Sequence, residues 1–143
     1  MPLVRVYLPL DAGALDTLRR TGEVGPAPVA GHTAVAPSAR PGLGNDDEER
    51  EYAAWSAAAT DAAALAQRGE RRVVASADVD AAVVNATTED GTTVELDSVV
   101  ALPRIASFHI DEEPGGEVAD LLWYDVTELD DVIRLVRGDE PTT

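Results

Sequence analysis

Apolar and polar residues recur along the chain with two periods, one typical of strands and one typical of helices. The first apolar run, residues 3–8 (LVRVYL), is rich in β-branched and aromatic side chains and is apolar on both faces. It therefore predicts a strand in the interior of a sheet. Asp11 stands at the N-cap position of a helix expected over 12–21, and Gly22 follows as its C-terminal stop.

Residues 22–44 are rich in glycine and proline, so we expect mostly loop there, with the letters HTAVA as a short strand. Residues 45–69 carry the clearest helical pattern, with Asn45 at the N-cap and acidic residues at the positive end of the helix dipole. One face of this helix carries aromatic side chains followed by alanines, and the small alanine side chains let a neighbouring backbone approach closely. Its members are Tyr52, Trp55, Ala59, Ala62 and Ala66.

The second half of the chain predicts mostly strands. They are expected over 71–79, in a hairpin over 82–96, within 99–111 with Pro103 at the start of the strand, and over 121–126. Asp90 and Gly91 supply the positive φ angles of a type I′ hairpin turn. Thr127 stands at the N-cap of a last helix, in which apolar residues recur at i, i+3, i+4 and i+7.

The order of these elements favours an α+β fold. We expect a single layered domain over residues 1–138, in which a mixed sheet of about five to six strands packs against three helices. The length of 143 residues is that of one ordinary domain, and residues 139–143 are expected to form a flexible tail.

The composition is strongly acidic: the net charge is −16, and all eleven basic residues are arginine. A chain this acidic repels phosphate backbones, so we expect no direct nucleic-acid binding. The same charge would let the protein imitate nucleic acid toward a basic partner. Codon bias in a high-GC genome, or adaptation to high salt, explains the composition without any role in function.

Cysteine is absent, which excludes disulfides, thiolate metal ligands and thiol nucleophiles. No apolar run approaches the roughly 20 residues that cross a bilayer. The N-terminal residues lack the small-residue cleavage site of a signal peptide. We therefore expect a cytoplasmic protein that does not contact membranes.

His109, Asp111 and Glu112 stand together where a predicted strand runs into an acidic segment. Strand alternation places Ser107 and Asp111 on the same polar face as His109, each about 7 Å away, with the imidazole pointing outward into an anionic surface. His109, Asp111 and Glu112, together with His32, are a candidate ligand or metal site. The other histidine, His32, lies far away in the sequence, and a tight transition-metal site requires a second imidazole or a thiolate, so we expect no metal and no cofactor.

Catalytic signatures are missing from the sequence: it contains no GxSxG, HExxH, P-loop or GxGxxG motif. Ser107, His109 and Asp111 have the residue types of a catalytic triad. Because they follow one another on one strand face, we expect the hydroxyl to lie outside hydrogen-bonding reach of the imidazole. We therefore assign no catalytic residue.

Aromatic residues supply a candidate interface. Trp123 and Tyr124 are neighbours in a predicted strand and must point to opposite faces, so we expect one in the core and the other toward a groove or a partner. Tyr52 and Trp55 share a helix face, which suits core packing or an interface.

The leading interpretation is a non-enzymatic binding or protein-interaction module that forms a homodimer or binds another protein. One alternative is a small metal-dependent or ligand-binding enzyme with a cleft near His109. The other is an acidic mimic of nucleic acid, which needs the carboxylates of 46–51 and 111–113 on one surface.

Several segments resemble a family of uncharacterised short proteins of actinobacteria, a domain of unknown function. The similar segments are RVYLP, GEVGPAP, DEEREYAA, RRVVASADV, IASFHIDE and LLWYDVTEL, spread over nearly the whole chain. The resemblance implies a cytoplasmic protein with no assigned activity and supplies no active-site residues. Family members often carry a longer acidic, alanine-rich segment before the LLWY strand, where this chain has only residues 112–120.

Overall fold

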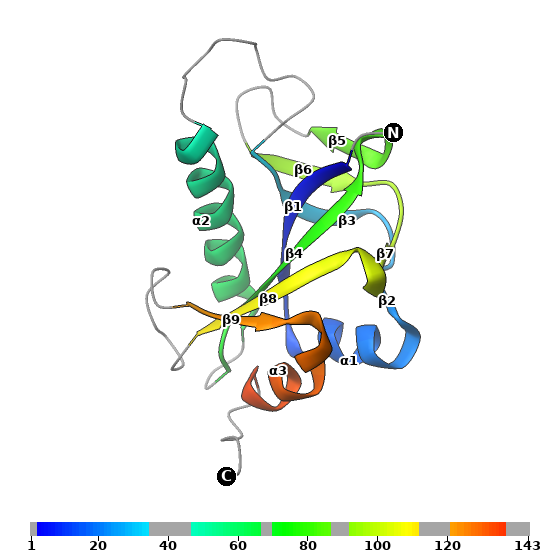
Figure 1. Ribbon diagram of the computed structural model, residues 1–143, viewed down its shortest axis with the longest axis vertical. Helices are drawn as coiled ribbons and strands as arrows, with labels where there is room; N and C mark the ends of the chain where they lie inside the picture. Colours follow the sequence, from blue (N-terminus) through cyan, green and yellow to red (C-terminus); the bar gives the residue numbers. More distant parts are fainter. Residues whose placement is uncertain (1–2, 35–46, 67–69, 87–91, 112–120, 137–143) are drawn as a thin grey trace.

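The computed structural model describes residues 3–34, 47–66, 70–86, 92–111 and 121–136. A seven-stranded sheet with the strand order β5-β6-β3-β1-β4-β8-β9 forms its centre, and the described strand pairs are antiparallel (Figure 1). Its strands are β1 (Leu3–Leu10), β3 (Val29–His32), β4 (Val73–Asp80), β5 (Val84–Ala86), β6 (Thr93–Leu96), β8 (Ile105–Asp111) and β9 (Leu121–Asp125). A separate two-stranded sheet pairs β2 (Glu23–Val24) with β7 (Val100–Ala101).

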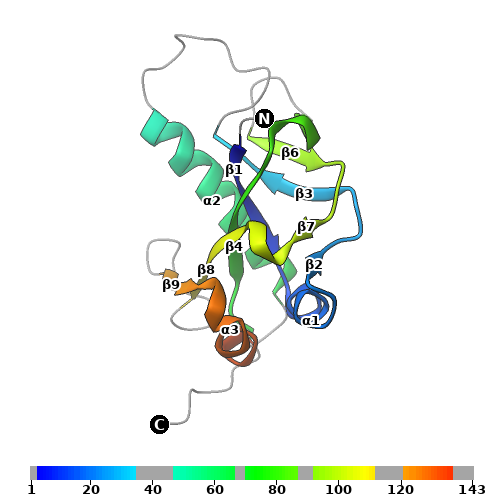
Figure 2. The same ribbon diagram turned by 45° about the vertical axis from the view of Figure 1, so that its right-hand side comes forward.

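Three α-helices pack against the main sheet from two sides (Figures 1 and 2). They are α1 (Ala12–Thr21), α2 (Asp47–Leu65) and α3 (Leu129–Val136), and short 3-10 turns stand at Ala81–Val83, Leu102–Arg104 and Val126–Glu128. None of the helices in the described part of the chain is long and apolar enough to cross a bilayer.

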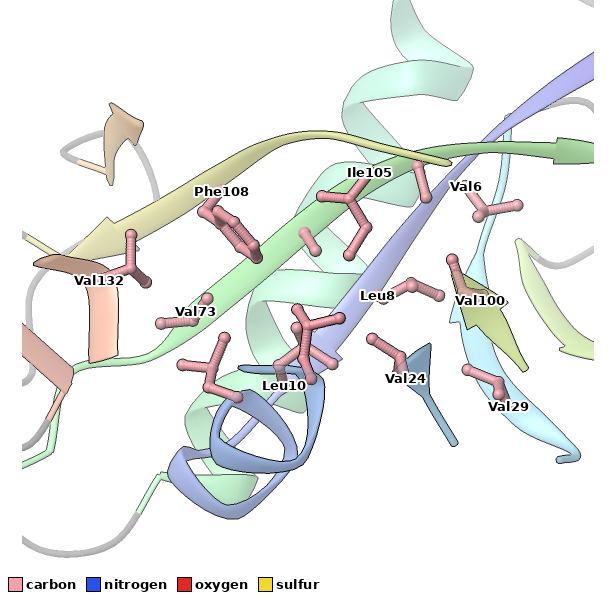
Figure 3. Close-up of a cluster of buried hydrophobic side chains, with 14 of the residues drawn as sticks. Val6, Leu8, Leu10, Val24, Val29, Val73, Val100, Ile105, Phe108 and Val132 are labelled. Atoms are coloured by element: carbon pink, nitrogen blue, oxygen red, sulfur yellow. The ribbon is translucent and has the colours of Figure 1, made fainter. Parts of the chain in front are cut away.

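The main hydrophobic core lies between the sheet and the helices α1 and α3 (Figure 3). Alternation along β1 produces it, because Val6, Leu8 and Leu10 are buried on one face of the strand. Phe108 of β8 and Val132 of α3 are fully buried in the same core. The small sheet closes one side of this core with Val24 and Val100.

A second, smaller core lies on the opposite face of the sheet, under α2. Ala58, Ala59 and Ala62 are fully buried there against Val74 of β4. Their small side chains let the helix axis approach the strands, as the sequence predicts. Trp55 and Tyr7 pack at the border of this core with their ring centroids 5.8 Å apart.

The α+β class and the interior position of the first strand are confirmed. The main sheet has seven strands, more than the five to six expected. One of them, β3, lies in the Gly/Pro-rich segment where we predicted mostly loop, and it ends at the first residue of HTAVA; β2 of the small sheet lies in the same segment. Asp11 and Gly22 bound α1 as predicted: the Asp11 carboxylate accepts from the Ala14 N–H at 2.7 Å, and Gly22 has φ of 78°.

Within residues 99–111, the strand expected from Pro103 onward is β8, and the residues before it form β7 of the small sheet and a 3-10 turn. The N-cap expected at Thr127 is wrong, because a 3-10 turn at Val126–Glu128 leads into α3 and Asp125 caps that turn in a reciprocal capping box with Glu128. The predicted cap Asn45, the turn at 90–91 and the tail at 139–143 lie outside the described residues.

Candidate functional site

His109 lies on β8, an interior strand between β4 and β9. Its Nε2 atom is 3.0 Å from the hydroxyl oxygen of Ser107 and 3.0 Å from that of Ser76 on the neighbouring strand. The ring centroid of Trp55 lies 4.6 Å from the imidazole, edge to face. The expectation of an outward-pointing imidazole beyond the reach of Ser107 is therefore wrong, because the ring turns back along its own strand beneath the helix α2.

Burial controls the protonation of this histidine. Burial, with a smaller contribution from the nearby Arg5 guanidinium, lowers the pKa of His109 from 6.5 to about 4. The imidazole is therefore neutral at neutral pH, and it is held between two hydroxyl groups.

The serine–histidine cluster is unsuited to nucleophilic catalysis. The residues Ser76 and Ser107 are only 2% and 3% exposed, so neither hydroxyl can meet a substrate in this conformation. Among the described residues no carboxylate is hydrogen-bonded to the ring of His109, whereas the triad mechanism needs one to orient the base. The cluster instead satisfies buried polar groups at the border of the small core.

Asp111 is buried rather than part of a solvated acidic surface. Its carboxylate accepts from the side-chain Nε of Arg72 at 3.0 Å and from the backbone N–H of Arg72 at 3.1 Å, and both residues are less than one tenth exposed. Asp111 therefore contributes nothing to a nucleic-acid-like surface, and Glu112 and the side chains of 46–50 lie outside what the structure describes.

The two histidines of the predicted metal site, His32 and His109, are not brought together by the fold. The strands β1 and β4 separate β3, which carries His32, from β8, which carries His109. Within the described ranges, no three residues of the types His, Asp and Glu are grouped so that they could hold a metal ion.

His32 instead holds a carboxylate on α2. Its ring is almost fully buried, and Nε2 donates to Asp61 Oδ2 at 2.5 Å, because a carboxylate can only accept. The other ring nitrogen, Nδ1, lies 2.9 Å from the hydroxyl of Thr92. The side chain of Asp61 remains 56% exposed. A buried imidazole thus fixes the position of a solvent-facing carboxylate.

Asp61 lines an open groove with a volume of about 460 Å³. The groove lies where β1 ends and β3 begins, which is the same end of the sheet because the two strands are antiparallel. Its described lining residues are Pro9, Leu10, Ala14, Val24, Gly25, Pro26, Pro28, Val29, Ala30, Asp61, Ala64 and Leu65. Leu10, Val24 and Val29 are among the side chains drawn in Figure 3. Among the described lining residues, Asp61 is the one with a polar side chain.

The four candidate interface aromatics occupy different environments. Tyr124 packs against the main core, whereas its neighbour Trp123 is 67% exposed on the edge strand β9, so one side chain faces inward and the other outward. Trp55 is half-buried against His109, but Tyr52 on the same helix is 65% exposed. Trp123 and Tyr52 are therefore the two that remain accessible.

Residues 4–133 match the profile of a family of unknown function (DUF6912). No curated protein and no solved structure matches the chain. The predicted resemblance to an uncharacterised family is confirmed.

Proposed function

Because the chain belongs to this family of unknown function, its role must be inferred from its own geometry, and we propose that it is a binding protein without catalytic activity. The observation that carries the proposal is the groove beside Asp61. Its volume of about 460 Å³ falls in the range of small-ligand sites, which are mostly apolar and have a few well-placed polar groups. The groove has that composition, with one oriented carboxylate in an apolar lining.

The distribution of buried groups supports binding over catalysis. The hydroxyl groups of Ser76 and Ser107, which have the residue type for nucleophilic catalysis, are closed off from solvent under α2. The carboxylate that faces the groove has an imidazole behind it, but neither a nucleophilic side chain nor a second carboxylate is among the described lining residues. General acid–base catalysis with a paired carboxylate therefore has no support at the groove.

A substitution that fills the groove tests this proposal. Ala64 lies on the exposed side of α2 and lines the groove, whereas the adjacent Ala63 is also exposed but is not among the lining residues. We expect Ala64→Trp to abolish binding of a neutral apolar probe, cyclohexylmethanol, and Ala63→Trp to leave it unchanged. Saturation-transfer NMR measures both. The proposal fails if the wild-type protein does not bind the probe, or if both variants behave alike.

The edge strand β9 supports a second contact, and we propose that it pairs two copies of the chain. An edge strand presents unpaired backbone groups, and Trp123 adds an exposed aromatic side chain of the kind that anchors interfaces. We expect light scattering to report a dimer that becomes a monomer in Trp123→Ser, with Tyr52→Ser as the control. A wild-type monomer at high concentration would contradict this.

A further inference from the structure

We propose that the groove recognises a small organic ammonium ion, a protonated amine carried on a compact hydrocarbon body, whose charged end meets the carboxylate of Asp61. This inference rests on the proposed binding function and adds the chemical class of the ligand to it.

The charge of the lining selects the class of ligand. Asp61 is the charged residue among the described residues that line the groove. The carboxylate of Asp61 is 56% exposed and so is open to a cation, while the apolar walls suit the hydrocarbon body of the ligand. The net charge of −16 adds a long-range attraction for cations and a repulsion for anions.

His32 acts as a positioning residue for this carboxylate. The hydrogen bond from Nε2 engages Oδ2 of Asp61, while Thr92 lies against Nδ1. A carboxylate that is already fixed loses little conformational freedom when a ligand binds, which favours affinity.

The walls of the groove favour a small amine over a peptide. Pro9, Pro26 and Pro28 line it, and none of them has a backbone N–H to offer. An extended peptide would bring backbone donors and acceptors that need partners on the protein. A hydrocarbon amine brings one polar group, which matches the one carboxylate among the described lining residues.

A pair of probes of the same shape tests the inference. Cyclohexylmethylamine is protonated at neutral pH, and cyclohexylmethanol is its neutral counterpart. Their affinities are measured by titration at constant ionic strength for the wild type, Asp61→Asn and Glu51→Gln. Asparagine at position 61 can still accept from His32, so the fold is retained. Glu51 is an exposed acid on the same helix, about 15 Å further along the axis. Its variant removes the same charge from the molecule without touching the groove.

We expect the amine to bind wild type and Glu51→Gln at least about tenfold more tightly than the alcohol, and the preference to vanish in Asp61→Asn. The inference is overturned if wild type binds both probes equally, or if Asp61→Asn keeps the preference. In either case the alcohol still binds the groove, and the proposed function stands. If neither probe binds, both fall.

A second pair of variants tests the positioning role of His32. His32→Gln keeps a side-chain N–H donor, whereas His32→Leu removes it. We expect the preference for the amine to persist in the glutamine variant and to fall several-fold in the leucine variant, while alcohol affinity stays the same in both. An equal loss of affinity for both probes would indicate a purely structural role of His32 and contradict its role in positioning the carboxylate.

Discussion

Arg72 and Asp111 form a buried ion pair at adjoining ends of β4 and β8. The guanidinium and the carboxylate are 8% and 3% exposed, so their mutual contact replaces water around both charges. Such a pair adds little stability compared with apolar residues of the same shape. Removing one partner, however, destabilises the fold, because it leaves a buried charge without a counter-charge. The stability of this corner of the sheet therefore depends on both residues being present.

Arg72→Leu should destabilise the protein by about 3–5 kcal/mol, because it leaves the carboxylate of Asp111 buried without its cation. Urea unfolding measures the loss. The matched control is Arg19→Leu, which breaks an ion pair whose side chains are 64% and 67% exposed, and should change stability by about 0.5 kcal/mol or less. Equal losses in the two variants would contradict the account.

The lowered pKa of His109 makes stability depend on pH in a defined direction. The native ring stays neutral down to about pH 4, whereas the unfolded ring takes up a proton below about 6.5. Between these values the unfolded state binds more protons, so stability falls as the pH falls. This contribution is complete above the unfolded pKa and is lost as the pH approaches the native one.

Comparison of the wild type with His109→Gln between pH 7 and about 4.5 tests this effect. The free energy of unfolding of the wild type should fall by about 1–2 kcal/mol more than that of the variant. This is less than a fully buried imidazole would lose, because the ring is partly exposed. Urea midpoints at each pH supply the measurement. Parallel pH profiles for the two proteins would show that His109 is not the titrating group.

At the scale of elements, the helix α1 is bounded by two residues with separate physical roles. Asp11 accepts from the first turn, and Gly22 adopts φ of 78°, a left-handed conformation that lets its N–H reach the Leu18 carbonyl. A side chain at Gly22 meets no neighbouring atom, so a substitution there changes backbone strain alone.

Gly22→Ala should therefore lower the free energy of unfolding by about 1 kcal/mol, because alanine is strained in the left-handed conformation. The control is Gly13→Ala in the same helix, where the added methyl group makes an ordinary contact at 3.6 Å with the Asp11 carboxylate. Alanine favours the helix at that position, so the control should be neutral or slightly stabilising. Thermal unfolding distinguishes the two, and a stable Gly22→Ala variant would rule out the strain.

Long periodic elements were predictable from the sequence, and short ones were not. The helix α1 and the strand β1 follow their patterns because burial on one or both faces controls their residues. The strands β2 and β3 are two and four residues long and contain too few positions for a period. They form because β7 and β6 supply pairing partners from distant parts of the chain, which no local pattern reveals.

At the scale of the whole molecule, the excess of acidic residues acts on the fold as self-repulsion. The net charge is −16 at pH 7. Raising the salt concentration from about 0.01 M to about 0.1 M shortens the screening length from about 30 Å to about 10 Å. We expect the urea midpoint to rise over this range, with a neutral solute of the same osmolarity as control. A midpoint that falls, or stays constant, would exclude repulsion as a significant destabilising effect.

The candidate site could not be predicted from the sequence for a related reason. His32 and Asp61 are far apart in the chain: His32 belongs to a segment expected to be mostly loop, and Asp61 belongs to the predicted helix over 45–69 but not to its apolar face. The residues at 109–112 were predicted as a site because they are adjacent in sequence. In the structure, however, Asp111 pairs with Arg72 just before β4, and His109 contacts Ser76 of β4. Strand order decides which side chains meet, and strand order is a property of the whole sheet.

The most direct test of a binding groove beside Asp61 is the location of backbone amide shifts when ¹⁵N-labelled protein is titrated with cyclohexylmethylamine. The account predicts saturable shifts confined to groove residues, with Leu10, Ala14, Ala30 and Leu65 among them. Shifts centred on His109 and Trp123 instead, or no saturable shifts at all, would contradict it.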